Sequence, residues 1–154
     1  MATVKAVKGP FTKGVNFTNW LEHRPADQVN PDFFTKQDFV NAKSLGCDVI
    51  RLPIHFERFC MEADGYCIPD CIWAILDRVA AWAEELQIYV IFDFHNNCHA
   101  DSATSDDVEQ VLTPVWEQIA KRYKDATEFL VYELMNEPHG IEVALWNEII
   151  DRLF

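Results

Sequence analysis

The sequence is poor in positive charge. It carries 13 Lys and Arg residues against 25 Asp and Glu residues, which gives a formal net charge of −12. Such an excess of acid repels the phosphates of nucleic acids and the head groups of anionic membranes. The composition therefore argues against a nucleic-acid-binding protein and against a protein that lies on an anionic membrane surface.

The sequence also lacks a long apolar run and a recognisable targeting segment. None of its apolar stretches approaches the roughly 18 residues that a membrane-spanning helix needs. Residues 1–5 have no basic region followed by an apolar core, so no signal peptide is expected and the localisation is left open. With 49% hydrophobic and 13% aromatic residues, the chain is expected to form a single domain, residues 1–154, with residues 1–13 as a lead-in.

Cysteine is present in an odd number, five. Cys60, Cys67 and Cys71 lie close together, and an oxidising compartment would allow a Cys60–Cys67 disulfide. Their spacing matches no familiar zinc-binding pattern, and free thiols are the preferred interpretation. Cys47 begins an apolar run and is interpreted as a small core residue.

What the sequence does contain is a regular alternation of apolar strands and amphipathic helices. Asp32 and Asp70 are the expected N-caps of two of the helices, and residues 56–66 are expected to form a loop. Strands are expected at residues 14–17, 47–54, 88–95 and 129–134, and helices at residues 32–44, 70–86, 108–124 and 143–153.

This order predicts an α/β fold made of four βα units. Short connections and right-handed crossovers give a parallel sheet with helices on one face. The last strand, with Phe129, Leu130, Val131 and Leu134, is expected to be buried on both faces. A complete (β/α)8 barrel, the TIM barrel, needs about 250 residues, and this chain has 154. The predicted fold is therefore a (βα)4 half of such a barrel.

Polar side chains stand at the carboxyl ends of these strands. Asn136-Glu137-Pro138 follows the last strand, and a carboxylic acid there is a candidate general acid with a raised pKa. Arg51 interrupts the second strand, and because burial of an unpaired guanidinium is costly, an acidic side chain is expected near it. Asp93 and His95 should point to the same side of the third strand. The alternatives are a plain βα turn at residues 136–138 and an Arg51 side chain that reaches solvent.

Four stretches occur in an order that resembles glycoside hydrolase family 5, the cellulases and related β-glycanases: GVNFTNW at residues 14–20, VIRLPI at 49–54, VIFDFHN at 90–96 and FLVYELMNEPHG at 129–140. The resemblance implies that Glu137 is the acid/base, which protonates the glycosidic oxygen and later activates water. It implies that Asn136 hydrogen-bonds the sugar 2-hydroxyl. Arg51 would hold the nucleophilic carboxylate ionised, and His95 would line the cleavage subsite. The family's nucleophile, a second Glu near the end of the seventh barrel strand, has no counterpart in these residues.

Further residues at the strand ends are candidates for binding substrate. Trp20 stands beside two Asn residues at the end of the first strand, where it could stack on a sugar ring or pack as an ordinary core aromatic. His55 follows the second strand, near a position where the family often has a substrate-contacting histidine. Asn96 opens a polar loop, residues 96–104, at the end of the third strand. Loops at the carboxyl ends of strands carry the active site in barrels of this type.

The implied activity is hydrolysis of β-1,4-glucan-type polysaccharide, as by an endoglucanase, with no cofactor. Mannanases and other glycanases share these residues, so the glycan and the retained or inverted outcome are left open. A competing hypothesis is a catalytically impaired half-barrel that binds glycan or only self-associates. A third is zinc held by His95, His99 and Glu137, with Cys98 nearby, although histidines that contact substrate without metal are preferred.

A half-barrel is also expected to associate. It would expose the sheet face that should fill a barrel interior, and its first and last strands would be unpaired edges. A twofold homodimer, in which the last strand of each copy pairs with the first strand of the other, would close an eight-stranded barrel. The partner's third strand, with its Asp93 and His95, would then take the place of the seventh strand of the family.

Overall fold

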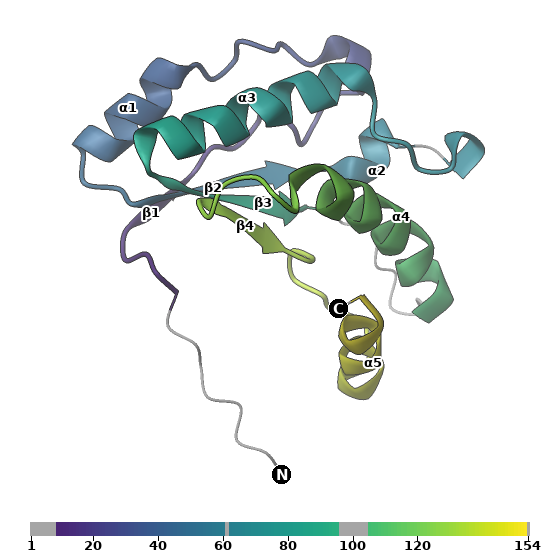
Figure 1. The fold of residues 1–154 in the computed structure, drawn as a ribbon. Helices are drawn as coiled ribbons and strands as arrows, with labels where there is room; N and C mark the ends of the chain where they lie inside the picture. The colour runs from purple at the N-terminus through teal and green to yellow at the C-terminus, as the bar shows by residue number, and fades with distance from the viewer. Residues whose placement is uncertain (1–8, 61, 96–104, 154) are drawn as a thin grey trace.

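The protein is described by a computed structural model that covers residues 9–60, 62–95 and 105–153. Four strands form one parallel sheet in the order β1-β2-β3-β4, and helices follow them along the chain (Figure 1). None of the described helices is both long enough and apolar enough to cross a membrane. The elements are β1 (Gly14–Asn16), η1 (Ala26–Gln28), α1 (Lys36–Ser44), β2 (Val49–Ile54), α2 (Phe56–Phe59), η2 (Glu62–Asp64), α3 (Asp70–Leu86), β3 (Tyr89–Phe94), α4 (Ser105–Tyr123), β4 (Leu130–Glu133) and α5 (Val143–Leu153).

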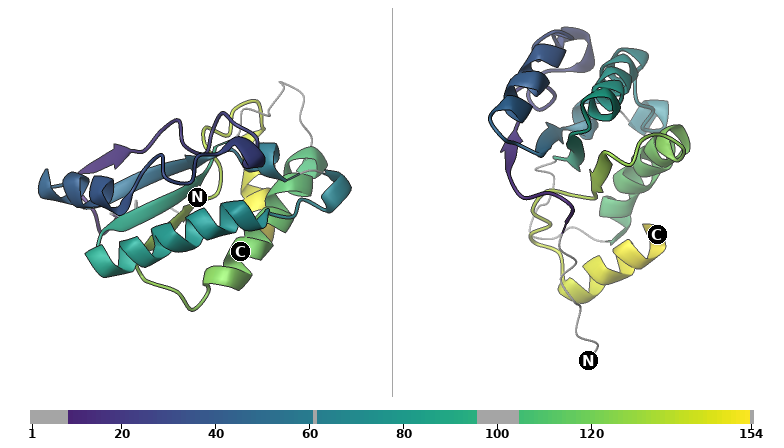
Figure 2. Two further views of the ribbon diagram at one scale, coloured as in Figure 1. Left: turned by 90° about the horizontal axis from the view of Figure 1, so that it is seen from above. Right: turned by 60° about the vertical axis from the view of Figure 1, so that its left-hand side comes forward.

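The predicted alternation of strands and helices is confirmed. The helices α1, α3, α4 and α5 form an arc outside the sheet, and no described helix covers its other face (Figure 2). Parallel strands with helices on one side are the arrangement that right-handed βα crossovers produce. The last helix has the predicted bounds, and the strands are each shorter than predicted by one or two residues.

The strand register decides which side chains share a face. Arg51 lies level with Asn16, Ile91 and Val131, and one layer further along the strands Asp93 lies level with Pro53 and Glu133. Side chains that are level in a parallel sheet point to the same face. Leu52 and Phe92, at the alternate positions, are buried in the core toward the helices, so the side chains of both layers point away from the helices. One guanidinium and two carboxylates therefore lie on the open face of the sheet.

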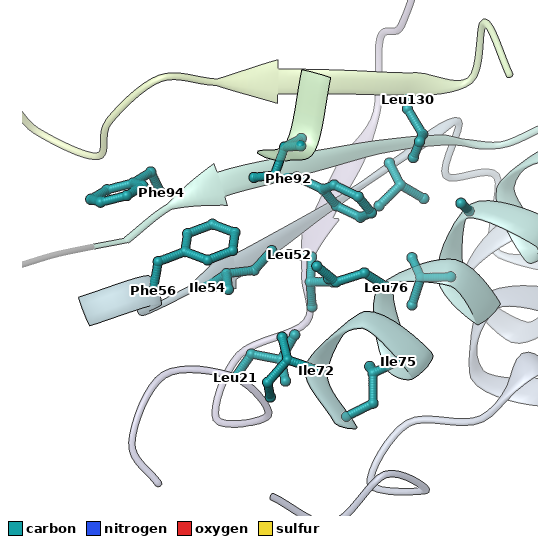
Figure 3. Close-up of a cluster of buried hydrophobic side chains, with 14 of the residues drawn as sticks. Leu21, Leu52, Ile54, Phe56, Ile72, Ile75, Leu76, Phe92, Phe94 and Leu130 are labelled. Atoms are coloured by element: carbon teal, nitrogen blue, oxygen red, sulfur yellow. The ribbon is translucent and has the colours of Figure 1, made fainter. Parts of the chain in front are cut away.

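The hydrophobic core lies between the sheet and the helices. Leu52 and Ile54 of β2 and Phe92 of β3 are fully buried, and they meet Ile72 and Leu76 of α3 (Figure 3). Burial of apolar surface contributes roughly 25 cal/mol per Å² to folding. This layer, rather than the open face, therefore holds the four units together.

The fourth strand is less buried than predicted. Leu130 packs into the core, but Val131 is only half-buried and Tyr132 is 39% exposed. The prediction that this strand is buried on both faces is wrong. Val131 lies on the open face, which no described helix covers, and Tyr132 lies on the helix side beside Phe92, in a strand that pairs only with β3 among the described residues. In the described part of the chain β1 is likewise paired on one side only, with β2.

Two predicted helix caps differ in the structure. The first long helix begins at Lys36, and a carboxylate oxygen of Asp38 accepts hydrogen bonds from the backbone N–H of Thr35 at 2.7 Å and from its hydroxyl at 2.8 Å. These bonds hold the pKa of Asp38 below its usual value. Asp32, the predicted cap, instead pairs with Arg78 of α3 at 3.0 Å. Thr35 is the N-cap, and it forms a capping box with Asp38, three residues further along the chain.

The second correction concerns the segment before α3. Pro69 occupies the N-cap position and Asp70 is the first helical residue, so Asp70 is not the cap. The predicted loop at residues 56–66 contains a short helix, α2, and a 3-10 turn, η2. Phe56 and Phe59 of α2 are buried, and this burial explains why the segment folds back as a helical turn.

The four described cysteines are free thiols, as preferred from the sequence. Cys60 is buried, and burial raises the pKa of its thiol to about 12. Such a thiol is almost never a thiolate at neutral pH and is therefore a poor partner for disulfide exchange. Cys98 lies outside the described residues.

Candidate active site

Arg51 is the centre of a polar cluster on the open face of the sheet. Its Nε donates to Glu133 Oε2 at 2.6 Å and its Nη2 donates to Glu133 Oε1 at 2.7 Å. The expected acidic partner is therefore present, and the alternative of an Arg51 side chain that only reaches solvent is excluded. The hydrogen bonds to Glu133 raise the pKa of Arg51, and the negative charges of Asp93, Glu133 and Glu137 add to this.

Asp93 is the buried acid of the cluster, with 0% of its surface exposed. Its Oδ2 lies 2.8 Å from Arg51 Nη2 and 2.6 Å from His95 Nδ1. Its Oδ1 is buried and has no hydrogen-bond partner among the described residues. Burial, aided by the charge of Glu133, raises the pKa of Asp93 to about 6, although His95 and Arg51 act in the other direction. The expectation that Asp93 and His95 point to one side is confirmed.

His95 lies between two carboxylates. Its Nδ1 faces Asp93, and its Nε2 lies 4.0 Å from Oε1 of Glu22, in the connection that follows β1. The second Glu22 oxygen accepts a hydrogen bond from the backbone N–H of Asn19, which adopts the left-handed conformation with φ 66°. A distance of 4.0 Å is too long for a hydrogen bond, but one hydroxyl group can lie within about 2.8 Å of both atoms.

The end of β4 carries Asn136 and Glu137. The backbone N–H of Asn136 donates to Phe94 O at 2.9 Å, and its side-chain Oδ1 accepts from Arg51 Nη2 at 2.9 Å. Glu137 is exposed and has φ 41°, an unusual backbone conformation for a residue before proline. The segment therefore holds Asn136 against the cluster and presents Glu137 to solvent.

The other predicted site residues are placed differently. Trp20 is 2% exposed and its Nε1 donates to Asn30 O at 2.9 Å, so it has no free face for a sugar and the core interpretation applies. His55 is half-buried, and burial lowers its pKa. Its Nδ1 is buried without a partner among the described residues. Asn96 lies outside the described residues.

The zinc hypothesis gains no support from the geometry. His99 and Cys98 lie outside the described residues, and within the described part no group of three or more His, Cys, Asp or Glu side chains is arranged to hold a metal ion. His95 has one ring nitrogen committed to Asp93. The described side chains instead form an acid-rich set around one guanidinium.

Two residues of the cluster were not predicted from the sequence. Glu133 lies two residues beyond Val131 on the face that carries Asp93, so its strand parity could have identified it. Glu22 follows the first strand by a few residues in an irregular segment, and only the fold brings it to His95. The assembled cluster draws side chains from β2, β3 and β4 and from the connections that follow β1 and β4. It can accept hydrogen bonds from hydroxyl groups, and it presents the exposed carboxyl group of Glu137.

Comparison with known proteins relates the chain to a family. A family model described as cellulase (glycosyl hydrolase family 5) matches residues 9–153. The chain is 34% identical over 109 residues to endoglucanase B of Clostridium cellulovorans, a match that covers 66% of this chain and 24% of that protein.

Solved structures are similar as well. The cellulose synthase subunit Z of Clostridioides difficile superposes with a TM-score of 0.78 at 27% identity, covering 93% of this chain and 47% of that chain. A mutant form of Cel5A from Thermotoga maritima, in complex with cellobiose, superposes with a TM-score of 0.78 at 26% identity, covering 93% of this chain and 49% of that one. The chain thus spans about half the length of these solved structures and matches part of their barrels.

Proposed function

This chain belongs to glycosyl hydrolase family 5, and we propose that it acts in the hydrolysis of β-1,4-glucan-type polysaccharides, as endoglucanases do. The observation that carries the proposal is the placement of Asn136 and Glu137 at the end of β4, beside the Arg51, Asp93 and His95 cluster. A neutral glycan suits a protein of net charge −12, because it carries no phosphate to be repelled.

In the proposed mechanism Glu137 is the general acid. Its carboxyl group gives a proton to the glycosidic oxygen as the bond to the anomeric carbon breaks, and the resulting carboxylate then takes a proton from water. The exposure of Glu137 supports this role because a polymer must reach it. Asn136 would donate to the sugar 2-hydroxyl, and His95 would line the cleavage subsite. His55 and Asn96 are proposed to contact the substrate.

The reaction needs a second carboxylate, and the described residues do not offer a free one beside Glu137. Glu133 is held by Arg51 through two hydrogen bonds, and Asp93 is fully buried. The second group would attack the anomeric carbon in a retaining mechanism or deprotonate water in an inverting one. We propose that it is supplied from outside this half-barrel domain.

The proposed source is a second copy of the chain. Among the residues that the structure describes, β1 and β4 each have one unpaired edge. β4 of one copy and β1 of the other can therefore pair around a twofold axis and close an eight-stranded barrel. The two copies of Glu137 would then face each other across the mouth. A separation of about 6.5–9.5 Å between the carboxyl groups would suit inversion, and about 5–5.5 Å would suit retention.

The competing function is glycan binding or self-association without catalysis. The chain spans about half the length of the solved structures that it resembles, and its described acids near Glu137 are engaged. Such a half-barrel would keep Asn136, His95 and Glu22 as ligands for sugar hydroxyls and would lack turnover.

Light scattering over a range of concentrations, with a reducing-sugar assay on the same fractions, tests the proposal. We expect activity that follows the dimer peak and is abolished in Glu137→Gln, with glycan binding retained. Glu142→Gln, a change at another exposed acid in the same connection, is the matched control and should stay active. A dimer without activity in the parent would favour the competing function, and a monomer without activity would rule out both catalysis and dimerisation.

A further inference from the structure

Glu133 accepts two hydrogen bonds from Arg51, yet the resemblance to the family assigned no role to it. Its two oxygens meet Nε and Nη2 of Arg51 at 2.6 and 2.7 Å. Paired contacts of this kind fix the plane of a guanidinium as well as its position. Arg51 is therefore held in one orientation by the last residue of β4.

The fixed guanidinium in turn determines how Asn136 is oriented. Nη2 carries two hydrogens, one directed to Glu133 Oε1 and the other directed to Asn136 Oδ1 at 2.9 Å. Arginine has donors only, so the Asn136 atom that faces it must be the amide oxygen. The amide nitrogen of Asn136, with its two donors, is consequently turned away from Arg51.

We propose that Glu133 is a positioning residue for Asn136, acting through Arg51. This inference rests on the proposed function, in which the Asn136 amide nitrogen donates to the sugar 2-hydroxyl. Glu133 holds the guanidinium, the guanidinium holds the amide oxygen, and the amide nitrogen is thereby directed to the substrate. Glu133 itself touches no reacting atom.

Charge balance alone does not account for Glu133. Asp93 already lies 2.8 Å from Nη2 of Arg51 and can neutralise the guanidinium without help. Asp93 contacts the guanidinium at Nη2, and a contact at one nitrogen leaves the guanidinium free to tilt. Glu133 adds the second point of attachment, at Nε, and this point defines the plane.

The first test uses nitrogen-15 NMR of the 154-residue chain to follow the side-chain N–H groups of Arg51 and Asn136. In the parent we expect a slowly exchanging Arg51 Nε–H signal and a resolved pair of Asn136 side-chain amide signals, assigned by their loss in Arg51→Lys and Asn136→Asp. In Glu133→Gln, whose amide can accept only one of the two bonds, the Nε–H should exchange at least about tenfold faster and the Asn136 pair should shift. Glu128→Gln, at an exposed acid outside the cluster, should change neither.

A second variant keeps the inference testable if Glu133→Gln fails to fold. Glu133→Asp keeps the charge but shortens the side chain by one methylene, so it should also lose the paired contact and give the same signal changes. Unchanged Asn136 signals in a folded Glu133 variant would overturn the inference, whether or not the Arg51 signal moves.

The second test uses turnover of a cellooligosaccharide. We expect kcat to fall by roughly tenfold to a hundredfold in Glu133→Gln with KM within about twofold, because a misdirected Asn136 loses a contact that strengthens in the transition state. If the parent shows no turnover but the NMR signals change as expected, the proposed function fails and the positioning of Asn136 stands. If the parent turns over and Glu133→Gln matches it in kcat, the positioning role fails and the proposed function stands.

Discussion

Asp93 and His95, two residues apart at the end of β3, are joined by a 2.6 Å contact between Asp93 Oδ2 and His95 Nδ1. This contact commits one ring nitrogen to a fully buried acid and leaves the other, Nε2, on the side of Glu22. The orientation of the imidazole is thus set by the half-barrel itself. The same is true of Arg51 and Asn136, which are held by Glu133 and by one another within the described half-barrel.

The stability of the protein should depend on the protonation of Asp93. Burial raises the pKa of Asp93 from 3.8 to about 6, so the folded state binds this proton more tightly than the unfolded chain does. The contribution of Asp93 to the free energy of unfolding therefore falls as the pH rises from about 4 to about 6, by on the order of 3 kcal/mol. Urea denaturation across this pH range should show this slope in the parent and a reduced one in Asp93→Asn.

The control for this experiment is Asp27→Asn, at an exposed acid outside the cluster, which should keep the parent slope. Identical slopes in Asp93→Asn and the parent would mean that the pKa of Asp93 is the same in the folded and unfolded states.

Removal of the Arg51 guanidinium should destabilise the fold. Arg51→Met leaves Asp93 and Glu133 as neighbouring carboxylates without their shared cation, and we expect a loss of about 3 kcal/mol in the free energy of unfolding. Arg51→Lys keeps the charge but cannot form the paired contact, and its loss should be smaller. Chemical denaturation measures both, and a Met variant as stable as the parent would contradict the central role of Arg51.

Substitution of Trp20 distinguishes its interpretation as a core residue from its interpretation as a residue that stacks on a sugar ring. Trp20→Phe removes the hydrogen bond to Asn30 and leaves space in a fully packed region, so stability should fall by about 1–3 kcal/mol. Glycan affinity, measured on the folded variant, should stay within about twofold of the parent. A large loss of affinity at unchanged stability would reinstate Trp20 as a substrate-binding residue.

Glu22 is expected to contribute to glycan binding. Its Oε1 and the Nε2 of His95 are 4.0 Å apart, a spacing that accommodates one sugar hydroxyl between them. Glu22→Gln should weaken cellobiose binding by about fivefold, which corresponds to about 1 kcal/mol. Calorimetric titration of this variant beside the exposed control Glu142→Gln checks the effect, and equal affinities would show that Glu22 only supports the loop through Asn19.

The proposed homodimer should strengthen as salt is added. Each copy carries a net charge of −12, so two copies repel one another at low ionic strength, and salt screens this repulsion. Light scattering at increasing sodium chloride should therefore give a falling dissociation constant. A dissociation constant that rises with salt would indicate that the contact is held by ion pairs instead of strand pairing and apolar burial.

Much of the fold could be predicted from residues that are neighbours in the chain. The spacing of apolar residues in Val143–Leu153 gave the bounds of α5 correctly, and the order of four βα units followed from the same kind of local periodicity. Errors arose where local signals competed, as at the start of α1, where Asp38 engages Thr35 and the predicted cap Asp32 pairs with α3. The burial of β4 was misjudged because the apolar composition of a strand does not reveal whether another layer covers it.

By itself the sequence determined the family, the parallel α/β architecture, and the requirement that Arg51 have an acidic partner. The family followed from the resemblance of four short stretches to glycoside hydrolase family 5. The architecture and the acidic partner followed from the periodicity of apolar residues and from the cost of burying one charge, which are local properties. Only the tertiary structure decided that this partner is Glu133, 82 residues away, that Asp93 is the buried acid, and that Glu22 reaches His95. Such contacts depend on strand register and on the path of the loop after β1, which arise only when all four strands are assembled.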